Sequence, residues 1–286
     1  MKNYSLLVGL ILLHVYGLSQ LSVAPSILFL NEKQSFGSFR LMNTLPETVE
    51  VSVEVVFSYP NYDSTGSIIL SSTGSVQEQF DLSDYIKIFP ARFFLKPKEF
   101  RELRISIPDH SDLPNNRTYF TRVNILSHPQ KKAVPSQTLQ ESVATVITMK
   151  IQQNLGVFFQ KGKTKAQIEA EFVDCVQDST GLNLLSKIKW SGNSPYLGSF
   201  KAHFFNANGD SLHSEYRHFH AYLSSNQKIN FPIMNQIEDS VLLKMEWKSQ
   251  RSDVPTKYLP PTTNYLLETW LTCRRQKNDN QTNNQP

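Results

Sequence analysis

Three histidines and one glutamate in the second half of the chain are the residues best suited, by type and spacing, to metal chemistry. They are His213, Glu215, His218 and His220, and in an extended strand His218 and His220 lie on the same face. Zinc usually takes three or four protein ligands, so two histidines on one face do not complete a site. We therefore interpret this segment as the polar face of an exposed strand, and we expect neither a metal nor another cofactor.

Sequence motifs that mark common enzyme active sites are absent. The chain has no Gly-x-Ser-x-Gly nucleophile elbow, phosphate-binding loop, Cys-x-x-Cys pair or His-Glu-x-x-His zinc motif. Scattered histidines and carboxylates could still converge in a cleft, as a hydrolytic sandwich enzyme would require. The pattern favours a protein that is not an enzyme, and no small-molecule substrate is evident.

The charge pattern argues against nucleic-acid binding. The chain has 29 Lys and Arg and 25 Asp and Glu, which give a net charge of +4 over 286 residues, and the cations are scattered. A nucleic-acid site would gather them on one stretch or face. We interpret these charges as solvated surface.

The first residues have the pattern of an export signal. Lys2 supplies a positive start, residues 6–15 are apolar, and small residues at Gly17 and Ser19 suit a signal peptidase. A membrane anchor is the alternative, but the apolar run is shorter than the ~20 residues that a spanning helix needs. We predict a signal peptide over residues 1–19, with cleavage before Gln20.

Short runs of β-branched and aromatic residues, separated by turn residues, predict an all-β protein. Val49, Val51 and Val53 alternate with polar residues, as in a strand with one buried face. The expected strands are 21–30, 34–43, 48–57, 84–90, 99–107, 117–126 and 143–153, then 166–173, 183–191, 198–206, 211–222, 228–233, 241–248 and 265–273. Residues 166–173 could instead form a helical turn. This spacing predicts two immunoglobulin-like β-sandwich domains.

The domain organisation follows from these strands. We expect an N-terminal domain over residues 20–154, a C-terminal domain over 155–275 and a disordered polar tail over 276–286. The long connections 58–83 and 127–142 have the composition of surface loops.

The chain has two cysteines, Cys175 and Cys273, both in the second domain. An exported protein reaches an oxidising compartment, where a disulfide is permitted. We expect a bridge between them, with two unpaired buried thiols as the alternative.

Three segments of the first half resemble one protein family. They are residues 37–44 (GSFRLMNT), 90–99 (PARFFLKPKE) and 103–105 (LRI), and residues 119–126 and 157–159 extend the likeness. In this order and spacing the sequence resembles the periplasmic chaperones of pilus and fimbria assembly, the PapD-like family. The resemblance implies two immunoglobulin-like domains and implies that Arg104 has a structural role, supported by a carboxylate partner.

The family resemblance also implies a way of binding. Such chaperones lend the last strand of the first domain to an incomplete pilus subunit, by adding a strand to its sheet. The matching strand here is 143–153, whose apolar face carries the predicted client-binding residues Val143, Ile147, Met149 and Ile151. The alternative is that this face packs against its own domain core.

Family members hold the client's terminal carboxylate with an arginine on the first strand and a lysine at the end of the donor strand. The matching positions here are Ile27 and Gly156, which carry no charge. Possible substitute cations are Lys150, Arg122 and Lys161.

The leading functional hypothesis is a periplasmic chaperone-like protein that binds pilin-like or other β-rich surface subunits by strand donation, with an outer-membrane usher as a possible second partner. The alternative is a structural or adhesion module of a surface or secretion assembly, located at the cell surface or secreted.

Overall fold

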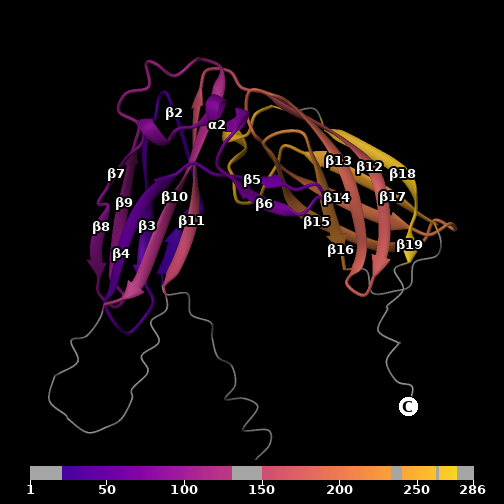
Figure 1. Cartoon of the computed structure of the whole chain (residues 1–286), viewed down its shortest axis with the longest axis horizontal. Coiled ribbons are helices and arrows are strands. Elements are labelled where there is room, and N and C mark those ends of the chain that lie inside the picture. Colours follow the sequence, from indigo (N-terminus) through magenta and orange to yellow (C-terminus); the bar gives the residue numbers. More distant parts are fainter. Residues whose placement is uncertain (1–20, 131–149, 233–239, 262–263, 276–286) are drawn as a thin grey trace, which may run out of the picture.

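The computed structural model describes residues 21–130, 150–232, 240–261 and 264–275, and these form two β-sandwiches (Figure 1). The all-β class and the two sandwich domains are therefore as predicted. The expected signal peptide, the 276–286 tail and the predicted client-binding residues Val143, Ile147 and Met149 lie outside the described residues.

The first sandwich packs two sheets face to face. One has the order β1 (Leu21–Ala24), β3 (Phe36–Asn43), β9 (Phe100–Ser106), β7 (Lys87–Phe89); the other has the order β2 (Ile27–Asn31), β11 (Ile151–Lys161), β10 (Arg117–Pro129), β4 (Val49–Val56), β8 (Arg92–Leu95). β1 and β2 are two halves of one edge segment that changes sheet at Pro25, and β7 and β8 do the same at Pro90. The arrangement matches an immunoglobulin-like sandwich.

Alternation along β4 shows how the sequence builds this core. Val49, Val51 and Val53 are buried between the sheets, whereas Glu50 and Ser52 point to the opposite face. Burial of these apolar side chains stabilises the sandwich by about 1.5–3 kcal/mol for each one fully removed from water.

The second sandwich also has two sheets. One has the order β16 (Ser225–Phe231), β13 (Gly181–Gly192), β12 (Ala166–Asp178), β19 (Arg274–Arg275); the other has the order β15 (Ser211–Ala221), β14 (Tyr196–Phe205), β17 (Ser240–Lys248), β18 (Tyr265–Thr272). Residues 166–173 are thus a strand and not a helical turn. The disulfide between Cys175 and Cys273, expected from export, joins β12 to the end of β18, with the two Cα atoms 4.6 Å apart.

Several expectations about element boundaries were wrong. The strand expected over residues 21–30 is divided between β1 and β2, and β8 lies where no strand was expected. The strand expected to end at residue 153 continues as β11 to Lys161, paired with β10 throughout. The connection 58–83 is not only a surface loop, because it holds β5 (Tyr59–Tyr62), β6 (Ile68–Ser71), α2 (Ser75–Phe80) and a 3-10 turn (Ser83–Tyr85). Its apolar side chains pack against the second sandwich, a contact that local composition does not reveal.

A third apolar cluster joins the two sandwiches. Phe120 of β10 is 2% exposed, and its ring centroid lies 5.2 Å from Phe57, 5.8 Å from Phe158 and 4.8 Å from Tyr222 of the second sandwich. The other buried members are Tyr59, Val76, Phe80, Leu197, Val254 and Leu259. The interface between the sandwiches is therefore built like a protein core.

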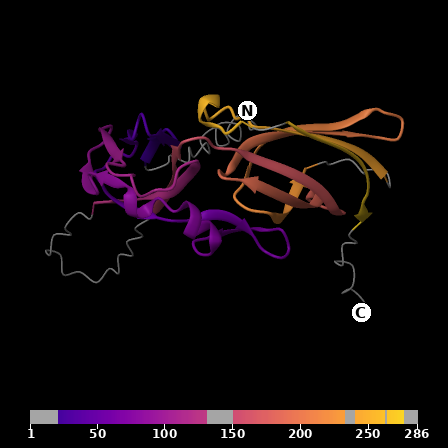
Figure 2. The same cartoon turned by 90° about the horizontal axis from the view of Figure 1, so that it is seen from above.

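β5 and β6 form a hairpin arm, residues 59–71, which leaves the first sandwich and reaches the second (Figures 1 and 2).

No helix within the described part of the chain combines the length and apolar character needed to cross a membrane.

Candidate functional site

A small cavity of about 190 Å³ lies where the two sandwiches meet. The first sandwich lines it with Ile27, Arg122 and Gly156 among others, and the second contributes His220 and Arg251. Arginines from both sandwiches therefore line this one cavity.

The cavity contains the two positions where cationic anchors were expected. Ile27 of β2 and Gly156 of β11 are partners in a parallel ladder, and Gly156 is also the partner of Arg122 on β10. The three residues thus form one row across the sheet. Arg122, one of the predicted substitute cations, lies one strand away from the expected anchor position.

Arg122 is held by neutral acceptors. Its Nε donates to the Ser58 carbonyl at 3.1 Å, and its Nη1 donates to Asn154 Oδ1 at 2.7 Å. Among the described residues no carboxylate forms an ion pair with this guanidinium. A positive charge of this kind, half-buried and without an acid beside it, favours a bound anion.

Arg251 contributes a second guanidinium to the cavity, and this one is paired. Its Nε donates to Asp253 Oδ1 at 2.9 Å and its Nη2 to Asp253 Oδ2 at 2.6 Å. The hydrogen bonds from Arg251 hold the pKa of Asp253 below its usual range. Two guanidinium groups and one carboxylate give the region of the cavity a net positive charge.

His220 is neutral in this setting. Burial, and then the charges of Arg251 and Arg122, lower the pKa of His220 to about 4. Its Nε2 atom is buried and has no hydrogen-bond partner among the described residues. Burial also raises the pKa of the neighbouring Tyr222. The cavity therefore holds a buried polar atom that a ligand or water could satisfy.

The edge of β11 leads to this cavity. β10 pairs with β11 from Ile151 to Lys161, whereas the ladder with β2 begins only at Gly156. The chain that would continue the line of β2 turns away at Pro25 and pairs with β3 as β1. Beside the first part of β11, the Gln153 side-chain amide donates to the Leu21 carbonyl at 2.9 Å.

Ile151 is half-buried at the start of β11, on the same alternation as the buried residues Leu155 and Val157. The Ile151 side chain therefore faces the core of the first sandwich. The sequence had left this open as the alternative to client binding. Lys150, a predicted substitute cation, is exposed immediately before the strand.

Lys161 does not lie on the cavity. Its Nζ is buried and donates to the carbonyls of His110 at 2.7 Å, Ser111 at 3.3 Å and Leu113 at 2.6 Å. These bonds hold the 110–113 turn against the end of β11, which is a structural role.

Arg104 differs from the expectation of a carboxylate partner. It is exposed on β9, opposite Ser38 on one side and Phe89 on the other. No described carboxylate forms an ion pair with Arg104, and its side chain points outward from the strand.

The histidines of β15 do not converge. His213 contacts Glu215 at 3.3 Å, whereas His218 lies 3.6 Å from Asp253. Within the ranges that the structure describes, no three metal-ligating side chains come together.

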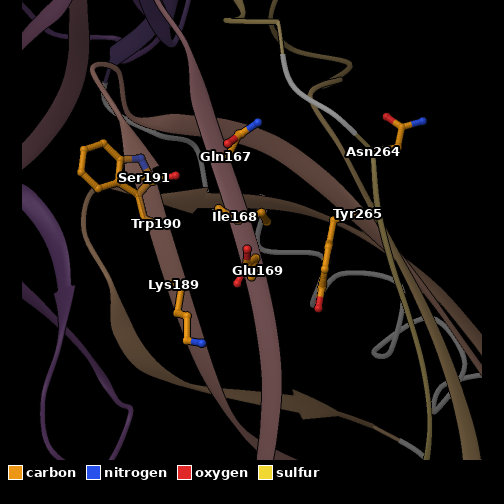
Figure 3. A pocket seen from close by; sticks show the side chains of 8 residues that line it. All are labelled: Gln167, Ile168, Glu169, Lys189, Trp190, Ser191, Asn264 and Tyr265. Atoms are coloured by element: carbon orange, nitrogen blue, oxygen red, sulfur yellow. The ribbon is translucent and has the colours of Figure 1, made fainter.

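A larger hollow of about 450 Å³ lies in the second sandwich, lined by Glu169, Lys189, Trp190 and Tyr265 among others (Figure 3). In Figure 3 the Trp190 ring points away from Tyr265. The polar atoms of both rings are already used, because Trp190 Nε1 donates to the Ser194 carbonyl and the Tyr265 hydroxyl to the Ala170 carbonyl.

Sequence reasoning missed Arg251 and the role of His220. Arg251 lies in a turn closed by its bridge to Val254, far along the chain from Arg122. No local pattern marks it, since its position at the cavity depends on how the two sandwiches meet.

No protein-family model matches the chain, and no curated protein matches it. Solved structures with a similar fold include the CsuC–CsuE chaperone–tip adhesion subunit complex of Acinetobacter baumannii, with 12% identity, a TM-score of 0.41, and coverage of 91% of this chain and 100% of that chain. The CupB2 chaperone of Pseudomonas aeruginosa has 10% identity and a TM-score of 0.44, with coverage of 86% of this chain and 98% of that chain. The Salmonella enterica SafA pilin in complex with the SafB chaperone has 12% identity and a TM-score of 0.41, with coverage of 87% of this chain and 96% of that chain. At these values the likeness alone assigns neither a family nor a function.

Proposed function

We propose that this protein is an exported chaperone-like protein, located in the periplasm, that binds β-rich subunits of pili or other surface structures. The observation that carries the proposal is the position of Arg122, in the cavity between the sandwiches and in the same row across the sheet as the two expected anchor positions, next to Gly156 and two strands from Ile27. It supplies the cation that Ile27 and Gly156 lack. The sequence motifs of the first domain point to the same function.

The binding step is the addition of a strand. An extended client segment that continues the line of β2 would lie beside the first part of β11, where β2 does not reach. Main-chain hydrogen bonds would supply affinity and alternating side chains would supply specificity. The client-binding residues predicted from the sequence, Val143, Ile147 and Met149, belong to this proposed donor segment.

At the end of that strand the client's terminal carboxylate would meet Arg122. A carboxylate that leaves water needs hydrogen bonds that replace its hydration. The guanidinium is already oriented by Ser58 and Asn154, so little further ordering is required. Charge-assisted hydrogen bonds of this type contribute about 1.5–3 kcal/mol.

The protein acts by binding and not by catalysis in this proposal, because the cavity brings together two arginines and a neutral histidine but no activated nucleophile. Export is supported by the disulfide, which suits an oxidising compartment. Terminal sequencing of the mature protein tests export: we expect a start at Gln20, and a start at Met1 would contradict it.

The functional test is recovery of bound chains from the periplasm. The tagged protein is purified under mild conditions, and the chains that accompany it are identified by mass spectrometry. We expect β-rich surface subunits with the wild type and at least a tenfold lower yield with Arg122→Gln. Arg104→Gln is the matched control, since it removes an exposed arginine outside the cavity.

A structural or adhesion module of a surface assembly is the second candidate. The observation in its favour is the absence of charge at Ile27 and Gly156. A wild-type protein that carries no subunit and is itself found within a surface assembly would support this candidate and overturn the chaperone proposal.

A further inference from the structure

The hairpin arm of residues 59–71 makes a backbone contact with the second sandwich at its tip. The Lys228 amide of β16 donates to the Gly66 carbonyl at 2.8 Å. Among the described strands, β16 is an edge strand that pairs with β13. This hydrogen bond is additional to the ladder between β16 and β13, and it joins the arm of the first sandwich to the second sandwich.

The tip fits closely enough to require glycine. Gly66 has a φ of +79°, and a Cβ atom built there would lie 2.7 Å from the Lys228 nitrogen and 2.8 Å from Leu185 Cδ1. A side chain at this position would push the tip away from β16, in addition to straining the backbone.

The loop before the tip is ordered by Asp63. Its Oδ1 accepts from the Thr65 amide at 2.8 Å, the Thr65 hydroxyl at 2.6 Å and the Ser67 amide at 3.0 Å. These bonds lower the pKa of Asp63, so the carboxylate stays ionised and retains them. The tip is thus shaped by the arm itself before it meets the second sandwich.

The base of the arm contacts both the second sandwich and Arg122. The buried ring of Tyr59 lies 5.9 Å from that of Tyr222, and Pro60 lines the cavity. Ser58, immediately before the arm, supplies the carbonyl that accepts from Arg122 Nε at 3.1 Å. One segment therefore holds Arg122 at one end and β16 at the other.

We propose that residues 59–71 are an interdomain clasp that fixes the relative orientation of the two sandwiches. The chain passes from the first sandwich to the second near residues 162–165, and Asn193 secures this link. The Asn193 carbonyl accepts from the Thr118 amide at 3.1 Å, and its Nδ2 donates to the Asn116 carbonyl at 2.7 Å. The tip of the arm adds an attachment separate from that link and from the aromatic cluster, and separated attachments restrict rotation that a single one would allow.

The clasp also sets the geometry of the cavity. Arg122 belongs to the first sandwich and Arg251 to the second, so the distance between their guanidinium groups depends on the orientation that the clasp fixes. This consequence holds whatever the cavity binds, so it can be tested on the protein without a client.

The test measures distances between the sandwiches by pulsed electron paramagnetic resonance. Spin labels are placed at Glu102→Cys and Lys201→Cys, which are exposed positions on β9 and β14. We expect one narrow distance distribution in the wild-type background and a broad or shifted one with Gly66→Ala. Gly74→Ala is the matched control, because Gly74 also has a positive φ, +92°, but no atom within 4 Å of its Cβ position.

A second variant separates the clasp from a folding defect. Replacing residues 63–67 with an Asn-Gly turn shortens the hairpin so that it cannot reach Lys228, while both strands of the arm keep a favourable connection. We expect this variant to keep the wild-type near-UV circular dichroism and to show the same loss of a narrow distribution. If the shortened variant folds and its distances stay as narrow as those of the wild type, the clasp proposal is wrong.

Discussion

Gly156 lies directly opposite Arg122 where β11 pairs with β10. Because Gly156 carries no side chain and Ile27 no charge, Arg122 is the charged residue of this row across the sheet. Ile27, the partner of Gly156 on its other side, is apolar. Arg122 therefore brings its charge to the cavity from β10, the strand next to β11.

The buried imidazole makes stability depend on pH. Since the pKa of His220 is about 4 in the folded protein and about 6.5 in an unfolded chain, protons bind the unfolded state first. Stability is greatest above pH 6.5 and falls as the pH drops toward 4, by about 2 kcal/mol between pH 7 and pH 5. Urea unfolding across this range checks the slope, and His220→Gln should remove most of it. A variant that keeps the full slope would show that other groups cause it.

The disulfide should stabilise the second sandwich. Its cysteines are separated by 98 residues, and closing a loop of that length contributes about 4–5 kcal/mol in the chain-entropy model. We expect the double variant Cys175→Ser, Cys273→Ser to unfold at a lower urea concentration, and the wild type to approach it in reductant. A thiol count on the denatured, unreduced protein should find no free thiol, and two free thiols would refute the bridge.

The aromatic cluster should make the two sandwiches unfold together. Phe120→Ala removes the ring that contacts Phe57, Phe158 and Tyr222, at a cost of about 3–5 kcal/mol. We expect calorimetry to show two separate transitions in this variant and one in the wild type. Phe100→Ala, at a site 52% exposed, is the control and should leave a single transition. One unchanged transition in both variants would argue against coupling through this cluster.

Met149→Asp tests whether the predicted donor segment is lent to a client. A charge in an apolar groove costs several kcal/mol unless it is paired, so strand donation predicts lost client recovery with unchanged melting. If the same face packs inside the first domain, the variant should instead melt at a much lower temperature. Unchanged melting with retained client would contradict donation and favour the structural module. Thermal melting and client recovery are measured on the same preparation.

Most of the strands could be predicted from the sequence alone. The alternation of Val49, Val51 and Val53 fixes which face of β4 is buried, because side chains on a strand alternate between faces. The turn residues between such runs separate most of the strands, but the division of residues 21–30 into β1 and β2 and the strand β8 were not predicted. The disulfide partners also followed, since the chain contains only two cysteines.

The arm and the cavity depended on tertiary structure. Ser, Thr and Gly residues between 58 and 83 have the composition of a loop, and the burial of Tyr59 and Phe80 becomes apparent only against the second sandwich. Arg122 and Arg251 are distant in the chain and belong to different sandwiches, so their meeting requires one particular packing of two cores. Sequence periodicity reports which face of a strand is buried, whereas the docking of two folded units is decided by side chains that no local pattern links.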